Sequence, residues 1–190
     1  MSQTTSLSRF PVPAVADLPA DLRDRIETLQ EKMGFIPNVF AVLAHRPEEL
    51  RAFLIYHDLL MEKDEGLSKA EREMIVVATS AANGCLYCTV SHGAFLRIRS
   101  KNPRLADQVA INYREAEISP RQRVMLDYAL KLSSTPWLVE DEDHERLAEA
   151  GFEPEEIWDI GAIVGLFAMS NRMASHTGMG PNPEFHGMAR

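Results

Sequence analysis

Apolar side chains recur every three to four residues along most of this chain, and no segment alternates between apolar and polar residues over the length of a strand. One such stripe consists of Leu22, Ile26, Leu29 and Met33, and Gly34 stands where a glycine commonly ends a helix. A period near 3.6 residues buries one face of a helix, whereas a half-buried strand needs a period of two. The pattern therefore predicts an all-α fold.

Start and stop signals predict where the individual helices lie. Ser68 and Glu71 have the spacing of a capping box, so a helix is expected to begin after Ser68. The Asn83-Gly84 pair interrupts this helix, and a new one is expected to begin at Cys85 and to reach about residue 100. Four more helices are expected, over these segments: Pro47 to Met61, Ser119-Pro120 to Leu132, Asp141 or Asp143 to Gly151, and Pro154 through the apolar run 160–169.

The size and charge of the chain exclude several classes of protein. Its 190 residues suit one domain with a substantial hydrophobic core. Asp and Glu outnumber Lys and Arg by 28 to 20, a net charge of −8, so neither nucleic acid nor a membrane surface is expected as a partner. The chain does not start like a secretory leader, and the apolar run 160–169 is about half of the roughly 20 residues that a membrane span requires. We therefore expect a cytoplasmic protein.

The two ends of the chain differ in composition from its middle. We divide the chain into an N-terminal arm (1–19), a helical domain (20–176) and a C-terminal tail (177–190), because prolines are frequent in the first segment and glycines and prolines in the last. The arm carries Phe10 and the tail carries Phe185, so both segments are candidates for holding subunits together. The alternative is that both are mobile ends.

Two cysteines and a histidine carry the most informative chemistry. On a helix that begins at Cys85, the side chains of Cys85, Cys88 and His92 fall within an arc of about 60°. The free N–H groups of a helix start and a nearby imidazole both favour a thiolate, which is the nucleophilic form of cysteine. We expect Cys88 to attack, with His92 one turn away as its base. Cys85, which we expect to be the more exposed thiol, would then resolve the product as a disulfide.

Glu73 is the third element of this candidate site. It lies on the preceding predicted helix, where the sequence becomes apolar on nearly all sides. A carboxylate at the edge of a buried region is suited to orient His92 or to relay its proton. We therefore predict catalytic roles for Cys88, Cys85, His92 and Glu73.

Other interpretations of the same residues exist. Cys85, Cys88 and His92 could bind zinc with Glu73 or His57 as a fourth ligand, but the chain lacks the second short-spaced Cys or His pair that structural zinc sites usually have. The cysteines could also be merely small buried side chains. His57 lies on the apolar stripe of its helix, so a core or interface position is favoured over one in the active pocket. We expect no metal and no cofactor.

The segment from Glu73 to His92, with Cys85-Leu-Tyr-Cys88 at its centre, resembles the signature of the AhpD-like superfamily. That superfamily includes alkylhydroperoxidase D proteins and carboxymuconolactone decarboxylases. The resemblance extends from about Leu22 to Gly180 and is strongest to the branch of uncharacterised peroxidase-related enzymes. Further matching segments are these: 37–40, 119–123, 126–131 and 170–174.

The resemblance implies a helical protein that assembles as trimers or hexamers and reduces hydroperoxides. By position, Cys88 corresponds to the attacking thiol and Cys85 to the resolving thiol, while His92 and Glu73 correspond to the proton relay. Electrons would come from an external dithiol, such as a lipoyl group on a protein or a thioredoxin-like protein. One residue departs from the pattern, because Tyr87 stands where well-studied AhpD proteins have His.

The leading hypothesis is therefore an oligomeric thiol peroxidase. Two alternatives keep the dithiol, namely a dithiol–disulfide oxidoreductase and a metal-binding or redox-sensing protein. A decarboxylase-type lyase is disfavoured, because that chemistry uses general acids and bases and has no need of a Cys-x-x-Cys pair.

Overall fold

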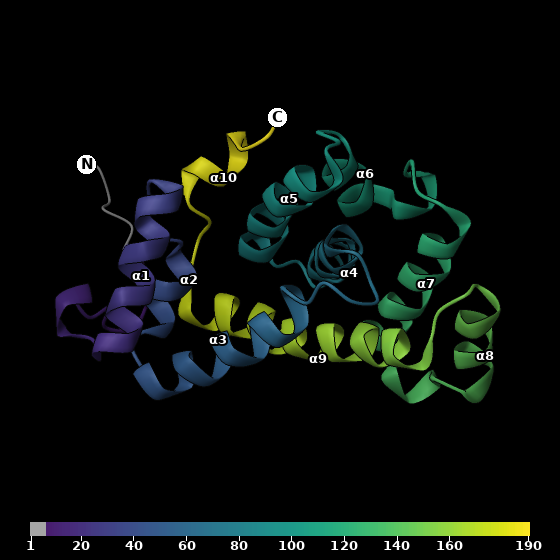
Figure 1. Ribbon diagram of the computed structural model, residues 1–190, viewed down its shortest axis with the longest axis horizontal. Helices are drawn as coiled ribbons and strands as arrows, with labels where there is room; N and C mark the ends of the chain where they lie inside the picture. The colour runs from purple at the N-terminus through teal and green to yellow at the C-terminus, as the bar shows by residue number, and fades with distance from the viewer. Residues whose placement is uncertain (1–6) are drawn as a thin grey trace.

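The computed structural model describes residues 7–190, and every regular element among them is a helix (Figure 1). About 73% of the chain is helical, which confirms the predicted all-α class. The α-helices are α1 (Ala20–Met33), α2 (Asn38–Leu43), α3 (Pro47–Met61), α4 (Lys69–Ala82), α5 (Leu86–Ser100), α6 (Leu105–Asn112), α7 (Pro120–Ser134), α8 (Asp141–Glu149), α9 (Pro154–Thr177) and α10 (Pro183–Gly187). Three single 3₁₀ turns are η1 (Val15–Asp17), η2 (Tyr113–Glu115) and η3 (Pro136–Leu138).

Helix α4 lies at the centre of the bundle and is seen nearly end-on in Figure 1, with α5, α6, α7 and α9 around it. Its residues from Glu71 to Ser80 are all buried, so it is surrounded on every side over almost three turns. Ser68 and Glu71 form both hydrogen bonds of the predicted capping box at its start. The helix that carries Glu73 is thus the core element on which the others pack.

A buried arginine joins this central helix to its surroundings. The Arg72 side chain is fully buried and donates hydrogen bonds to the backbone carbonyls of Leu60, Glu65 and Leu67. It also forms an ion pair of 3.0 Å with Asp159 on α9. Five donors in a planar group allow one side chain to satisfy all of these acceptors.

Most predicted helix boundaries agree with the structure, and that of α8 needs a correction. Gly34 ends α1 in the left-handed conformation (φ 82°), as expected. The N-cap of α8 is Glu140 and neither Asp141 nor Asp143. Asp143 instead accepts the backbone N–H of Glu140 at 2.9 Å, which is the reciprocal half of a capping box. The short helices α2, α6 and α10 were not expected from the sequence.

The C-terminal tail packs against the helical domain of its own chain. Phe185 is 1% exposed, and the Arg97 guanidinium donates to the carbonyl oxygens of Phe185 and Met188, both at 2.8 Å. At the other end, the Arg9 side chain donates to the carbonyls of Ser175 and His176. From residue 7 onward the two end segments therefore pack on this chain and are not mobile ends.

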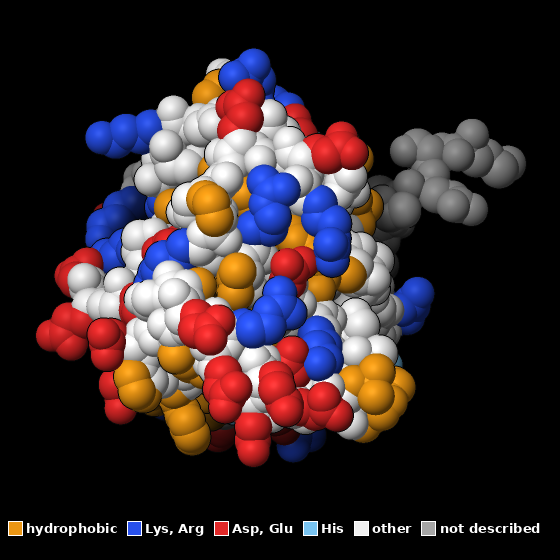
Figure 2. All heavy atoms as spheres, turned by 90° about the vertical axis from the view of Figure 1, so that its right-hand side faces the viewer, with side chains coloured by type: hydrophobic (Ala, Val, Ile, Leu, Met, Phe, Trp, Pro, Cys, Tyr) orange, Lys and Arg blue, Asp and Glu red, His pale blue; other side chains and the backbone are white. Residues whose placement is uncertain are grey.

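The surface charges and the helix lengths can be compared with the expectation that neither nucleic acid nor a membrane is a partner. On the face in Figure 2, which is the right-hand side of Figure 1, Lys and Arg side chains are interspersed with Asp and Glu and do not gather in one patch. Among residues 7–190, no helix combines the length and the apolar character of a membrane-spanning segment.

Candidate active site

The two cysteines lie at the turn between α4 and α5. Gly84 adopts the left-handed conformation (φ 65°), and Cys85 follows as the N-cap residue of α5. The Cys85 sulfur accepts the backbone N–H of Cys88 at 3.5 Å, and the two cysteines approach to 3.3 Å. A disulfide between them would therefore need only a small movement of the side chains.

Both cysteines are buried, so the expected difference in exposure between Cys85 and Cys88 is small. Cys85 is 3% exposed and Cys88 is 1% exposed. Val42 on α2 and Met179 beyond α9 belong to the apolar cluster that covers them. The N-cap position alone predicted access to solvent, but segments distant in the sequence cover this helix start.

The two thiols have opposite protonation preferences. The hydrogen bond with the Cys88 thiol lowers the pKa of Cys85 to about 7, and the backbone N–H groups of Cys88 and Tyr87 act in the same direction. The same contact, together with burial, raises the pKa of Cys88 above its ordinary value. As the pH rises through about 7, Cys85 therefore loses its proton first, and the proton that Cys88 keeps is shared with the Cys85 thiolate.

Two polar residues of α9 complete the surroundings of the sulfurs. Ser170 Oγ lies 3.8 Å from Cys88 Sγ. The Asn171 amide is held between Ser80 and Asn83, with both hydrogen bonds at 3.0 Å, and its side chain lowers the pKa of both thiols. The structure thus places Asn171 beside the dithiol. Ser170 received no role from the sequence, since a serine in an apolar helix gives no signal of its own.

A cavity of about 240 Å³ opens beside Cys88. Cys88 and His92 line it, whereas Cys85 does not, so the two thiols are distinguished by access. Six helices contribute to its walls, which include five phenylalanines: Phe40 (α2), Phe53 (α3), Phe95 (α5), Phe167 (α9) and Phe185 (α10). Such a cavity suits an apolar molecule with a polar reactive end.

His92 is oriented by Glu73, as the sequence predicted. His92 Nδ1 lies 2.7 Å from Glu73 Oε2, and the Glu73 carboxylate is 2% exposed. Arg99 Nε lies 3.5 Å from the other carboxylate oxygen. Within residues 7–190, no hydrogen bond joins His92 to a cysteine. The relay between His92 and the thiols therefore stays a prediction.

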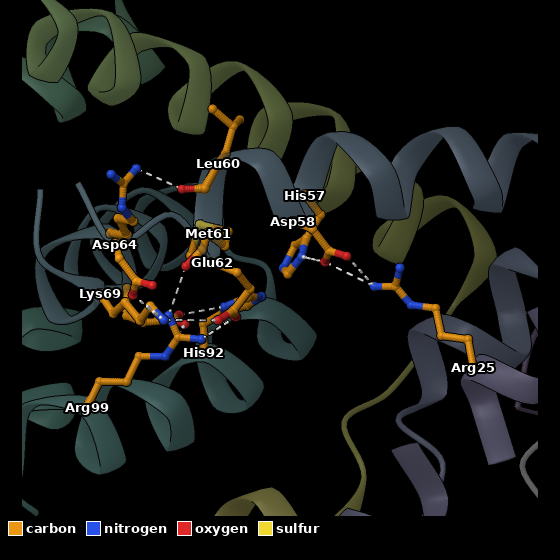
Figure 3. A network of polar contacts seen from close by, with 12 residues as sticks. Arg25, His57, Asp58, Leu60, Met61, Glu62, Asp64, Lys69, His92 and Arg99 are labelled. Atoms are coloured by element: carbon orange, nitrogen blue, oxygen red, sulfur yellow. Dashed lines mark hydrogen bonds and ion pairs between the residues drawn. The ribbon is translucent and has the colours of Figure 1, made fainter. Parts of the chain in front are cut away.

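His57 also lines the cavity, so the favoured expectation of a core or interface position was wrong. Its Nδ1 lies 3.2 Å from Asp58 Oδ1, and the Asp58 carboxylate forms an ion pair of 2.8 Å with Arg25 of α1. Figure 3 shows these contacts in a line from Arg25 through Asp58 to His57. The two imidazole rings, of His57 and His92, lie 6.4 Å apart between centroids.

In the part of the chain that the structure describes, no cluster of three or more His, Cys, Asp or Glu is arranged to hold a metal ion.

Tyr87 links the dithiol helix to α2. Its hydroxyl accepts the backbone N–H of Val39 at 3.1 Å, and its ring lines the cavity. Val39 lies in the first turn of α2, where backbone N–H groups lack partners within the helix. In this chain, the position that is His in well-studied AhpD proteins therefore caps a neighbouring helix.

Comparisons with known proteins identify the family. The chain is 60% identical over 97% of both chains to an uncharacterized peroxidase-related protein from Ralstonia eutropha JMP134, solved as an alkylhydroperoxidase AhpD core, with a TM-score of 0.95. The chain belongs to the AhpD-like superfamily. Residues 47–130 match the model of the carboxymuconolactone decarboxylase family. This matched segment of the chain contains α3 to α6 and both cysteines.

Two further solved structures extend the comparison. An uncharacterized peroxidase-related protein from Silicibacter sp. TM1040 is 42% identical over the whole of both chains, with a TM-score of 0.93. The debrominase Bmp8 is 18% identical over 99% of this chain and 98% of its own, and its TM-score of 0.79 shows a shared fold. A comparison with curated proteins gave no match.

Proposed function

We propose that this AhpD-like protein is a thiol-dependent peroxidase in which Cys88 attacks a hydroperoxide and Cys85 resolves the product. One observation carries the proposal: Cys88 lines the apolar cavity, and Cys85 lies 3.3 Å behind it, away from that cavity. A molecule in the cavity can therefore reach the second cysteine of the pair but not the first.

The first step oxidises Cys88. The Cys85 thiolate or His92 takes the Cys88 proton, and the Cys88 sulfur attacks the terminal oxygen of R–O–O–H. The O–O bond breaks, Cys88 becomes a sulfenic acid, and the remaining oxygen leaves and gains a proton to form R–OH. Ser170 and Asn171 stabilise the Cys88 thiolate as it forms, because both side chains lower the pKa of Cys88.

The second step forms the disulfide. The Cys85 sulfur attacks Cys88 and displaces the hydroxyl group as water, with one proton supplied by the site. Cys85 suits this role because its pKa of about 7 makes it a nucleophile at neutral pH. Because Cys85 and Cys88 are 3.3 Å apart, the disulfide can form with only a small movement of their side chains.

The third step requires an external dithiol. Because Cys88 lines the cavity, the reductant thiolate attacks Cys88 and displaces Cys85 as a thiolate, and its second thiol then releases Cys88. Cys85 is a good leaving group because its thiolate is stabilised at the helix start. With both thiols at most 3% exposed, a slender dithiol such as a lipoyl group fits this access better than the surface of a thioredoxin-like protein.

We also propose that the protein works as an oligomer, a trimer or a hexamer. Apolar side chains are exposed on neighbouring helices, with Ile55 and Leu59 on α3 and Trp158 on α9 exposed by 56%, 64% and 73%. Light scattering coupled to size exclusion would give the mass, and a monomer at micromolar concentration would contradict this part of the proposal.

The test is a mass measurement after a single exposure to cumene hydroperoxide. Reduced wild-type protein should lose both alkylation sites, and Cys85→Ser should accumulate a dimedone-reactive sulfenic acid on Cys88. Cys88→Ser should consume no peroxide. Two thiols that stay fully alkylatable in the wild type would refute the peroxidase proposal, and turnover of a disulfide substrate would then favour the dithiol–disulfide oxidoreductase.

A further inference from the structure

A second imidazole lines the reaction cavity and comes from a different helix than Cys88. His57 lies on α3, while Cys88 and His92 lie on α5. We propose that His57 is a second catalytic residue, the general acid that protonates the leaving oxygen of the hydroperoxide. This inference rests on the proposed peroxidase function. It names the residue that supplies a proton to the leaving oxygen in the first step.

The contacts of His57 fix the direction of its ring. Nδ1 is engaged by Asp58 at 3.2 Å, and Asp58 is held by Arg25 at 2.8 and 3.0 Å (Figure 3). Nε2 of His57 has no hydrogen-bond partner among residues 7–190. An imidazole that is oriented through Nδ1 by a carboxylate has its other nitrogen available for proton transfer.

His92 is held in a closely similar way. Its Nδ1 contacts the Glu73 carboxylate at 2.7 Å, and that carboxylate is next to Arg99. The cavity is thus lined by two carboxylate–imidazole pairs from different helices, each backed by an arginine. The charged and titratable groups that face His57 are Arg25 from α1, Asp58 from its own helix and His92 from α5, whereas α9 contributes the uncharged Phe167.

The spacing of the two rings suits a peroxide. Their centroids are 6.4 Å apart, and the edge of Phe167 packs against both. Because both rings line this one cavity, a hydroperoxide bound in it can contact both imidazoles while its organic group lies against the phenylalanine side chains.

The roles divide by position. His92 lies one turn beyond Cys88 on the same helix, so it serves the thiol, together with the Cys85 thiolate. His57 reaches the cavity from a different helix, α3, and the proposal places it at the leaving oxygen. The Cys88 thiolate takes the terminal OH group, the O–O bond breaks, and the alkoxide takes the Nε2 proton of a His57 imidazolium, which becomes a neutral imidazole with its remaining proton on Nδ1 toward Asp58. His57 regains a proton from solvent, since its side chain is 24% exposed.

The test compares two oxidants whose leaving groups differ in basicity. tert-Butyl hydroperoxide releases a strongly basic alkoxide and needs a general acid, whereas peracetic acid releases a carboxylate, whose conjugate acid has a pKa near 4 and which needs none. Loss of the first thiol is measured by rapid quenching of the pre-reduced wild type, His57→Gln and His92→Gln. His144→Gln, a histidine bound to Tyr128 far from the dithiol, is the matched control.

We expect His57→Gln to slow the reaction with tert-butyl hydroperoxide about 100-fold and that with peracetic acid less than threefold. His92→Gln should slow both reactions by a similar factor, because it acts on the nucleophile. Equal effects of His57→Gln on both oxidants, or none on either, in a protein with wild-type thermal stability would overturn the inference. If His57→Gln is unstable, the same comparison is made with His57→Asn. Wild-type thiols that react with neither oxidant would instead refute the proposed function.

Discussion

The Cys85 sulfur accepts the backbone N–H of Cys88, so the first cysteine of the pair is held by the start of the helix that carries the second. This relationship separates two properties that are often combined in one cysteine. The thiol with the lower pKa is Cys85, and the thiol with access to the cavity is Cys88. The pair acts as one unit, in which Cys85 loses its proton as the pH rises through about 7 while Cys88 keeps its proton.

A titration of thiolate absorbance at 240 nm tests this arrangement. Because the pKa of Cys85 is lowered to about 7, the reduced protein should gain one thiolate as the pH rises from 6 to 8. The second thiol should stay protonated to at least pH 9, since its pKa is raised. Cys88→Ser should move the midpoint upward, because the largest cause of the Cys85 shift is its contact with Cys88. A single step of two thiolates near pH 8.5 would contradict the shared proton.

The Glu73–His92 contact should matter for turnover more than for folding. Glu73→Gln keeps the shape of the side chain but removes the charge that orients His92, so peroxide reduction should fall about 10- to 100-fold. The pH–rate profile of the variant should also shift, which a purely structural effect would not produce. Glu117→Gln, an exposed carboxylate bound to Arg104, is the matched control and should have wild-type kinetics. A wild-type rate and pH profile for Glu73→Gln would rule out the relay.

Tyr87→Phe removes the hydroxyl that accepts the N–H of Val39. The unpaired N–H at the start of α2 should lower the free energy of unfolding by about 1–2 kcal/mol. Chemical denaturation measures the change, with Tyr56→Phe as the control on a 45% exposed tyrosine. Equal stability of the two variants would show that the hydroxyl does not cap α2.

Phe185 closes one wall of the cavity from α10. Phe185→Ala removes a ring that is 1% exposed and packs edge-on against Phe35, so we expect a loss of about 3 kcal/mol in unfolding free energy. The larger cavity should favour cumene hydroperoxide over hydrogen peroxide, measured as a ratio of kcat/KM values. An unchanged ratio in a folded variant would show that this wall does not select the substrate.

Local patterns in the sequence predicted those parts of the site that lie close together in the chain. The capping box at Ser68, the break at Asn83-Gly84 and the helix that follows place Glu73, Cys88 and His92 by local geometry alone. All of these expectations about helix limits agree with the structure.

The parts that sequence could not predict depend on long-range packing. Cys85 is buried because α2 and the residues after α9 cover it, and neither contact leaves a periodic signal. His57 looked like a core residue because it lies on an apolar stripe, and only the position of α1 reveals the Arg25 contact behind Asp58. The tail looked detached because a five-residue helix carries too short a pattern to recognise.

This difference between near and distant contacts has a consequence for how the protein reaches its active form. The dithiol and the Glu73–His92 pair need only α4, a turn and α5, whereas the cavity takes residues from Arg25 to Phe185. Short loops close sooner than long ones during folding. The loop closures that bring the reactive thiols and the Glu73–His92 pair together are therefore shorter than those that build the cavity walls around them.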